Sequence, residues 1–214
     1  MRTAVLISGR GSNLQALIEA CARPAASAKI VLVISNREDA AGLRHADAAG
    51  IATETIPHGA FSTGVGFENA IDRTLREHAV AVVCLAGFMR VLSPWFVERW
   101  RDRLLNVHPS LLPAFRGLDT HRRVLEAGVR FTGCTVHLVR AEVDAGPIVV
   151  QAVVPVRQDD TEGSLAARVL VAEHRCYPMA LELLASGRAR VIDERVVIDG
   201  ATASDAMVLN PPSL

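Results

Sequence analysis

Asn106 and His108 are the residues of this sequence whose types and spacing best suit catalysis. They stand two positions apart in the largely apolar segment LNVHPSLLP (residues 105–113), so strand alternation would point both side chains to the same side. Pro109 and Pro113 exclude a helix there and stiffen the exit loop. Asparagine donates hydrogen bonds without titrating, and histidine titrates near neutral pH. The pair suits a reaction in which an oxyanion forms and a proton moves.

Simpler roles fit the same residue types. An asparagine before a turn is often a capping or turn residue, and a lone histidine is often a surface or satisfied core residue. The residue types alone therefore leave catalysis and structure both open at Asn106 and His108. Other segments have to decide between the two interpretations.

The segment SGRGSNL (residues 8–14) is a candidate anion site after the first apolar run. Its glycines permit a sharp turn, and the following helix would point its N-terminal N–H groups to the same place. Together these groups would bind a phosphate. The pattern is not a dinucleotide fingerprint because Leu14 stands at the third glycine position, and no Gly-Lys-Ser/Thr follows as in a P-loop. The alternative is an ordinary glycine-rich turn capped by Ser12.

The composition favours small-molecule partners. Hydrophobic residues make up 50% of the 214 positions, which is ample for one sizeable core. Lys+Arg and Asp+Glu both number 23, so no basic excess indicates a nucleic acid and no polybasic run indicates a membrane surface. The four cysteines are scattered without a Cys-x-x-Cys pair, so we expect no metal site. Without a signal-peptide pattern, we expect a soluble cytoplasmic protein.

Strand-like and helix-like segments alternate through the first half of the chain. We expect strands at residues 3–8, 29–35, 52–56 and 79–86, and helices at residues 13–21, 40–49 and 67–78. Residues 79–86 form an almost uninterrupted apolar run, typical of a central parallel strand covered on both faces. This alternation predicts an α/β fold with a doubly wound, mostly parallel sheet.

The pattern changes after His108. Residues 132–139 and 147–156 both indicate strands joined by a short loop, so we expect an antiparallel addition to the sheet. Residues 165–185 predict a long amphipathic helix, and Asp159, Asp160 and Thr161 before it are candidates for its start. We divide the chain into a domain of residues 1–192 and a carboxyl-terminal extension of residues 193–214, with a hairpin at residues 193–200 and a loose tail.

Seven short segments together carry a resemblance to a known family. They are GSN at 11–13, LAGFMR at 85–90, NVHPSLLP at 106–113, GLDTH at 117–121, GCTVH at 133–137, VDAGPI at 143–148 and AEH at 172–174. In this order they make the chain similar to the glycinamide ribonucleotide formyltransferases, the folate-dependent enzymes of purine synthesis. The resemblance covers roughly residues 3–192. The segment around His108 and the segment around Asp144 are its most specific parts.

The resemblance implies transfer of a formyl group from 10-formyltetrahydrofolate, as a co-substrate, to the amine of glycinamide ribonucleotide. It implies that Asn106, His108 and Asp144 are catalytic. An amine that attacks a formyl carbon makes a negative oxygen, to which the Asn106 amide can donate. His108 can donate as well or relay the proton of the amine, and Asp144 can orient the imidazole. Which of these roles His108 has is not decided by the sequence.

The resemblance also implies two binding regions. For the ribonucleotide the residues are Gly11, Ser12, Asn13, Gly87 and Glu173. For the folate they are Met89, Arg90, Val91, Leu92, Arg140, Ala141, Glu142 and Val143. We interpret His121 and His137 as structural. The chain departs from the family at Gly64, where a basic residue usually contacts the folate, and in the extension after Ile192.

The alternatives are another folate-dependent formyltransferase, a formyltetrahydrofolate hydrolase of the same fold, or a non-catalytic nucleotide- or folate-binding protein. We expect none of the extra domains of methionyl-tRNA formyltransferases or of the hydrolases, because the first strand begins at Thr3 and little chain follows residue 192. Intact Asn106, His108 and Asp144 argue against a binding protein. The sequence leaves a homodimer open and gives no kinetic constants or polyglutamate preference.

Overall fold

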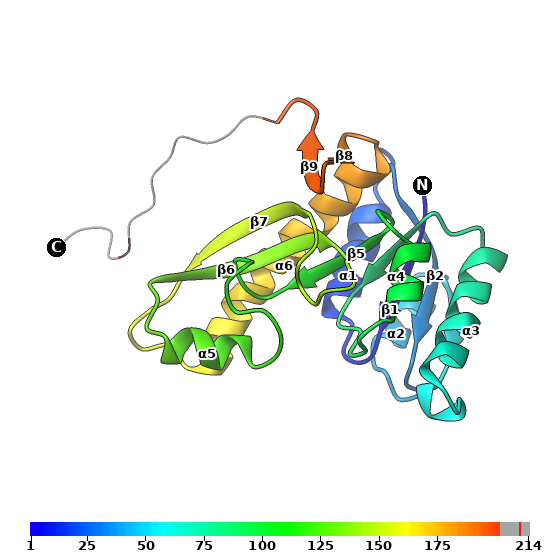
Figure 1. The fold of residues 1–214 in the computed structure, drawn as a ribbon, viewed down its shortest axis with the longest axis horizontal. Helices are drawn as coiled ribbons and strands as arrows, with labels where there is room; N and C mark the ends of the chain where they lie inside the picture. The colour runs from blue at the N-terminus through cyan, green and yellow to red at the C-terminus, as the bar shows by residue number, and fades with distance from the viewer. Residues whose placement is uncertain (202–209, 211–214) are drawn as a thin grey trace.

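A seven-stranded sheet between two helical layers dominates the structure, a computed structural model that describes residues 1–201 and 210 (Figure 1). The strands of the large sheet are β1 (Arg2–Ile7), β2 (Lys29–Ser35), β3 (Ala52–Thr55), β4 (Val82–Leu85), β5 (Leu104–His108), β6 (Phe131–Leu138) and β7 (Ile148–Pro155). The helices are α1 (Ser12–Cys21), α2 (Leu43–Ala48), α3 (Gly64–Glu77), α4 (Pro94–Arg99), α5 (Thr120–Glu126) and α6 (Glu162–Ala185), with a 3-10 turn η1 (His58–Ala60). A separate hairpin consists of β8 (Ala189–Ile192) and β9 (Arg195–Ile198).

The strand order is β3-β2-β1-β4-β5-β6-β7. Pairs from β3 to β5 are parallel, and β5–β6 and β6–β7 are antiparallel, which confirms the predicted doubly wound sheet with an antiparallel addition. The chain moves outward from β1 to β3 and returns to β4 on the other side of β1, so the order reverses between β1 and β4. Ligands of open α/β sheets bind outside the strand carboxyl ends at such a reversal.

Side-chain alternation along β1 explains the two layers. Val5 and Ile7 belong to a buried cluster that contains apolar residues of α1 and α6, and Ala4 and Leu6 belong to another that contains those of α3 and α4. Because both faces of β1 are covered, the strand is apolar at nearly every position, as parallel central strands are. The sheet is thereby fixed on both sides, and its strand ends can hold a site.

Most predicted elements are present with shifted ends. The strand expected at residues 29–35 is β2, whose bounds agree fully. Helix α3 begins one turn earlier than expected, because Thr63 accepts a hydrogen bond from the Gly66 N–H and caps the helix there. Helix α6 begins after a capping box between Thr161 and Ser164, which confirms Thr161 among the candidate helix starts. Helices α4 and α5, with 6 and 7 residues, were not predicted.

The predicted carboxyl-terminal hairpin forms, but its position is corrected. Its first strand is β8, which lies before residue 193, and residues 193 and 194 form the turn. Both turn residues have positive φ, at 49° and 58°, which is the geometry of a tight two-residue hairpin. The division at residues 192 and 193 would therefore cut the hairpin between its strands. The expected loose tail lies outside the described residues except at Ala201 and Asn210.

Candidate active site

The loops after β1 and β4 meet at the point where the strand order reverses. The N–H of Met89, in the loop after β4, donates to the Ser8 hydroxyl at the end of β1 over 2.9 Å. Gly87 has a φ of 71°, a left-handed conformation that glycine adopts at little cost, and it turns the chain after β4. The two loops thus make one wall of a site beside β5, which is the next strand of the sheet.

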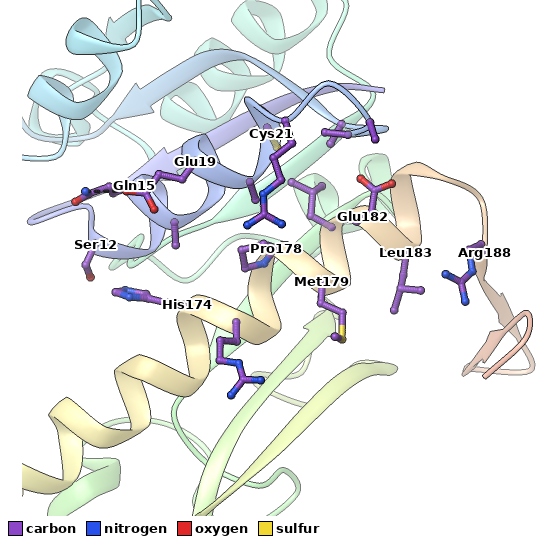
Figure 2. A pocket seen from close by; sticks show the side chains of 18 residues that line it. Ser12, Gln15, Glu19, Cys21, His174, Pro178, Met179, Glu182, Leu183 and Arg188 are labelled. Atoms are coloured by element: carbon purple, nitrogen blue, oxygen red, sulfur yellow. Dashed lines mark hydrogen bonds between the residues drawn. The ribbon is translucent and has the colours of Figure 1, made fainter. Parts of the chain in front are cut away.

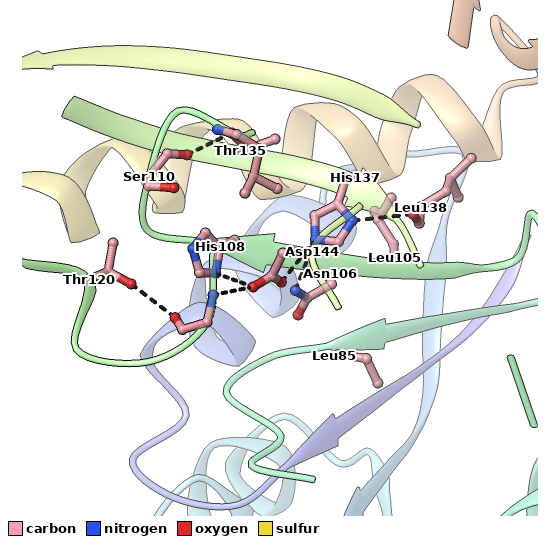
Figure 3. A network of polar contacts seen from close by, with 12 residues as sticks. Leu85, Leu105, Asn106, His108, Ser110, Thr120, Thr135, His137, Leu138 and Asp144 are labelled. Atoms are coloured by element: carbon pink, nitrogen blue, oxygen red, sulfur yellow. Dashed lines mark hydrogen bonds and ion pairs between the residues drawn. The ribbon is translucent and has the colours of Figure 1, made fainter. Parts of the chain in front are cut away.

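Asn106 on β5 and His137 on β6 face each other across the antiparallel ladder. The Asn106 Nδ2 atom lies 3.1 Å from the His137 Nε2 atom, and the His137 Nδ1 atom lies 3.2 Å from the Leu138 carbonyl oxygen (Figure 3). A carbonyl only accepts, so Nδ1 carries the proton and Nε2 accepts from the amide. Burial lowers the pKa of His137, which favours this neutral ring. The Asn106 amide is therefore oriented by His137.

His108, two residues along β5, contacts Asp144 in the loop between β6 and β7. The His108 Nδ1 atom lies 3.2 Å from the Asp144 Oδ2 atom, and both side chains are buried. The other ring nitrogen, Nε2, lies 2.9 Å from the Phe115 carbonyl oxygen. The Gly117 N–H donates to the same Asp144 oxygen over 2.9 Å. Asp144 therefore joins β5 to the loop that follows it, as Figure 3 shows.

Asp144 also approaches the second histidine. Its Oδ1 atom lies 3.7 Å from the His137 Nε2 atom. The carboxylate thus stands between two imidazoles, with Asn106 beside one of them. The structure places together the three side chains that the sequence suggested as catalytic, and it adds His137, for which the sequence alone suggested a structural role.

The candidate anion loop has the geometry that a phosphate site needs. Gly11 is the N-cap of α1 with a φ of 77°, and among the described residues no side chain caps this helix. Ser12 is therefore the first helical residue, and the expected alternative of a Ser12 cap is wrong. A Cβ at Gly11 would lie 2.6 Å from the Gly42 Cα atom, so the loop backbone is packed directly against α2. The uncapped N–H groups of the first turn remain available to an anion.

Asn13 and Glu173 connect this loop to α6. The Asn13 Nδ2 atom donates to the Glu173 Oε2 atom over 2.7 Å. Glu173 is buried, and desolvation raises the pKa of its carboxyl while the Asn13 hydrogen bond opposes that shift. Two residues that the sequence suggested for one ligand, 160 positions apart, therefore lie in direct contact.

A small cavity of about 160 Å³ opens beside the polar cluster. Its lining combines the loop after β4 with the loop after β6. From the predicted folate residues it includes Arg90, Val91, Leu92, Arg140, Ala141 and Val143, and from the catalytic ones Asn106 and Asp144. The sequence suggested no site role for the other lining residues, which are Leu85, Phe88, Val97, His137 and Val139. The four apolar residues gave no local signal for a site, and His137 was interpreted as structural.

Two predicted folate residues do not line this cavity. The Met89 side chain is 73% exposed, and its contribution to the site is the backbone bond to Ser8. Glu142 forms an ion pair with Arg116 at the surface. Gly64, the position of the departure from the family, begins α3 after the Thr63 cap.

A larger groove of about 830 Å³ lies between α1 and α6 (Figure 2). Ser12 lies at one end of it and Arg188, before the hairpin, at the other. Among the described residues that line this groove, none belongs to the polar cluster of Asn106, His108 and Asp144. The groove is therefore separate from the cluster and touches the candidate site only at Ser12.

Comparison with known proteins identifies the family. The model of the formyl transferase family matches residues 1–181. The phosphoribosylglycinamide formyltransferase of Escherichia coli is 45% identical over 200 residues, which are 94% of this chain and 94% of that protein. The chain belongs to the phosphoribosylglycinamide formyltransferase family. The glycinamide ribonucleotide transformylase 1 structure from Symbiobacterium toebii superposes with a TM-score of 0.90 at 44% identity, and the alignment covers 92% of this chain and 93% of that one.

A second kind of relative is much longer. The trifunctional purine biosynthetic protein adenosine-3 of Gallus gallus is 53% identical over 191 residues, which are 89% of this chain but only 19% of that protein. The chain thus spans about a fifth of the length of this relative. The residues that match the formyl transferase family model, 1–181, include every residue suggested for the site. Strands β8 and β9 lie beyond the matched residues.

Two further observations concern the described residues only. Within residues 1–201 and 210, no helix is both long and apolar enough to cross a bilayer. The same part of the chain contains no group of three or more His, Cys, Asp or Glu residues placed to hold a metal ion.

Proposed function

We propose that the protein transfers the formyl group of 10-formyltetrahydrofolate to the amine of glycinamide ribonucleotide. The products are formylglycinamide ribonucleotide and tetrahydrofolate, in a step of purine synthesis. The observation that carries the proposal is the cluster of Asn106, His108, His137 and Asp144 between an uncapped helix start and a partly apolar cavity. The Escherichia coli relative, whose name states this activity, supports it over nearly its whole length.

The reaction makes one bond and breaks another. The amine nitrogen bonds to the formyl carbon, the bond from that carbon to N10 of the folate breaks, and one proton passes from the amine to N10. The formyl oxygen gains negative charge during the attack, so a nearby donor lowers the barrier. The Asn106 amide has two N–H groups, of which His137 accepts one. We assign the second to this oxygen.

We assign the proton transfer to His108 and Asp144. The His108 ring lies between two acceptors, the Asp144 carboxylate and the Phe115 carbonyl oxygen, so a doubly protonated ring satisfies both. Nε2 can serve the amine only after it leaves the Phe115 oxygen. We therefore expect the segment of residues 109–119 to shift when substrate binds. During this shift Asp144 holds the imidazole in its orientation, as the carboxylate of a hydrolytic triad does.

The two ends of the site suit different substrates. The N–H groups at Gly11, Ser12 and Asn13 suit the phosphate of the ribonucleotide, and Glu173, in contact with Asn13, suits its hydroxyl groups. The cavity beside Asp144 has apolar walls from Leu92 and its neighbours, with polar groups at one side. This combination suits a flat ring with a hydrogen-bonding edge, as the pterin of a formyl folate has.

A steady-state assay tests the proposal. Purified protein is mixed with both substrates, and the formation of tetrahydrofolate is measured with and without the ribonucleotide. Product that depends on both substrates supports formyl transfer. Product without the ribonucleotide would indicate a hydrolase, and absence of product despite binding of both ligands would indicate a binding protein; either result contradicts the proposal.

A further inference from the structure

The turn of the β8–β9 hairpin holds a glutamate in a conformation that glutamate seldom adopts. Glu194 has a φ of 58° and follows Asp193, whose φ is 49°. Turns of this kind favour Gly, Asn and Asp, because a longer side chain is strained at positive φ. A residue in such a conformation persists where the surrounding structure holds it there.

The Glu194 carboxylate contacts Arg140. The Arg140 Nε atom donates to the Glu194 Oε2 atom over 2.7 Å, and the Arg140 Nη2 atom donates to the Asp102 Oδ1 atom over 2.7 Å. The Arg140 side chain is only 12% exposed. Asp102, like Glu194, has a positive φ of 58°. Two turns distant in sequence thus present carboxylates to one guanidinium.

The same carboxylate is held from its other side. The Glu194 Oε1 atom accepts from the Arg101 Nη2 atom over 2.5 Å, and the Arg101 Nη1 atom donates to the Glu98 Oε2 atom over 3.0 Å. Glu194 therefore lies between two arginines from different elements. The hydrogen bond from Arg140 lowers the pKa of Glu194, which favours the charged carboxylate.

Arg140 stands at the start of the loop of residues 139–147, which carries Asp144. The base of this loop is closed by backbone contacts: the Leu138 N–H donates to the Pro147 carbonyl over 2.9 Å. A Cβ on Gly146 would lie 1.6 Å from the Leu138 oxygen, so the loop folds tightly back on β6. Arg140, Ala141, Val143 and Asp144 of this loop line the cavity. The Arg140 side chain ties the start of the loop to Glu194 and Asp102.

We propose that Glu194 is a positioning residue that holds Arg140 and thereby fixes the loop of residues 139–147 beside the formyl donor. The hairpin thus acts on the active site although it lies beyond the segment shared with the family model. This inference rests on the proposed function for its kinetic consequence, and on geometry alone for its effect on the loop.

Kinetics of Glu194→Gln test the proposal. The variant removes the charge and keeps the size of the side chain. We expect the KM for 10-formyltetrahydrofolate to rise about threefold to fivefold, the scale of one weakened ion pair. The KM for the ribonucleotide should change less than about twofold on the same scale. A general loss of structure would instead raise the KM values for both substrates together.

Asp199→Asn is the matched control. Asp199 ends the same hairpin and pairs with Arg190 over 2.8 Å, away from Arg140. We expect its kinetic constants to equal those of the wild type. A second test is a cycle with Arg140→Ala, in which adding Glu194→Gln should have no further effect if Glu194 acts through Arg140. Additive effects, or an unchanged donor KM in Glu194→Gln, would overturn the proposal.

Hydrogen exchange gives a readout without turnover. In Glu194→Gln the backbone amides of residues 140–146 should exchange faster than in the wild type, and in Asp199→Asn they should not. Equal exchange in all three proteins would overturn the proposal. If the wild type transfers no formyl group, the proposed function fails, and hydrogen exchange alone then decides whether Glu194 positions the loop.

Discussion

The Nε2 atom of His137 lies 3.1 Å from the Nδ2 atom of Asn106, directly across the β5–β6 ladder. Because burial lowers the pKa of this histidine and its Nδ1 atom bonds to the Leu138 carbonyl, Nε2 is an acceptor with a fixed direction. The contact orients the Asn106 amide so that its second N–H remains available. An oxyanion donor that is oriented before substrate arrives requires little reorganisation during the reaction.

The first prediction follows from this contact. His137→Phe keeps an aromatic ring but removes the acceptor, so Asn106 is free to rotate and kcat should fall about 10-fold, less than loss of a whole oxyanion donor. His137→Gln should recover part of the loss, since its amide oxygen can accept. His78→Gln, at the C-cap of α3, is the control. Equal kcat in His137→Phe and wild type would show that His137 does not orient Asn106.

The second prediction concerns the three proposed catalytic side chains. Asn106→Ala, His108→Ala and Asp144→Asn should each lower kcat by at least about 10²-fold, the scale of one lost oxyanion donor or acid-base group. Asparagine is the better replacement at Asp144, because Asp144 has a φ of 52° and asparagine tolerates that conformation. Isothermal titration should show far smaller changes in substrate affinity. Near-normal turnover in any variant would remove that residue from the mechanism.

The third prediction concerns the stability of the buried carboxylate. Burial raises the pKa of Glu173 above its ordinary value, so the folded protein holds this proton more tightly than the unfolded chain does. The resulting stability is present at low pH and is lost as pH rises through the folded-state pKa. Glu173→Gln cannot ionise and keeps an acceptor for Asn13. Its Tm should therefore exceed that of the wild type at pH 7. Each kcal/mol gained in the free energy of unfolding corresponds to roughly 2–4 °C for a protein of this size.

The difference in Tm should vanish as the pH falls below the ordinary range of glutamate. Thermal unfolding measured across that range checks the sign. The same variant should raise the KM for the ribonucleotide, because the charged carboxylate is the better acceptor for ribose hydroxyls. A variant less stable than the wild type at pH 7 would show that burial of the ionised Glu173 carboxylate does not destabilise the folded protein.

The fourth prediction concerns the anion loop. Gly11 is a poor position for the test, since its left-handed φ and its contact with Gly42 mean that a side chain would displace the loop. Arg10→Glu changes the charge of an exposed side chain of the loop without placing a side chain against packed backbone. The KM for the ribonucleotide should rise several-fold at low salt, and the effect should fade at high salt.

Arg23→Glu makes the same change of charge beyond the other end of α1 and is the control. Its KM for the ribonucleotide should stay near that of the wild type. If both variants raise this KM equally, the anion does not bind at the start of α1.

The local pattern predicted much of the fold because each long element has its own signal. Strand β2 is an apolar run with polar ends, and its bounds agreed with the prediction. Helices α4 and α5 are too short to show a helical period, and α4 is held by buried contacts of Phe96 and by a Ser93 cap. The start of β8 was missed because the turn at Asp193 and Glu194 lacks glycine.

The site could be predicted only in part. Asn106 and His108 were recognisable because they share one strand and alternate with apolar residues. His137 acts on Asn106 through the register between two strands, across 31 positions of sequence, and no local pattern encodes that register. The contact between Arg140 and Glu194 spans 54 positions and depends on how the hairpin lies against the sheet. Contacts of this kind are set by how whole elements pack together, so a local sequence pattern does not predict them.

The most direct test of the central claim follows the label of the formyl group. The protein is mixed in excess with 10-formyltetrahydrofolate labelled at the formyl carbon and with glycinamide ribonucleotide, in a single turnover. We predict that the label appears on the ribonucleotide in equal amount to the tetrahydrofolate released, and that His108→Ala forms both at least about 10²-fold more slowly. Label recovered as free formate, or no transfer by the wild type, would contradict the account.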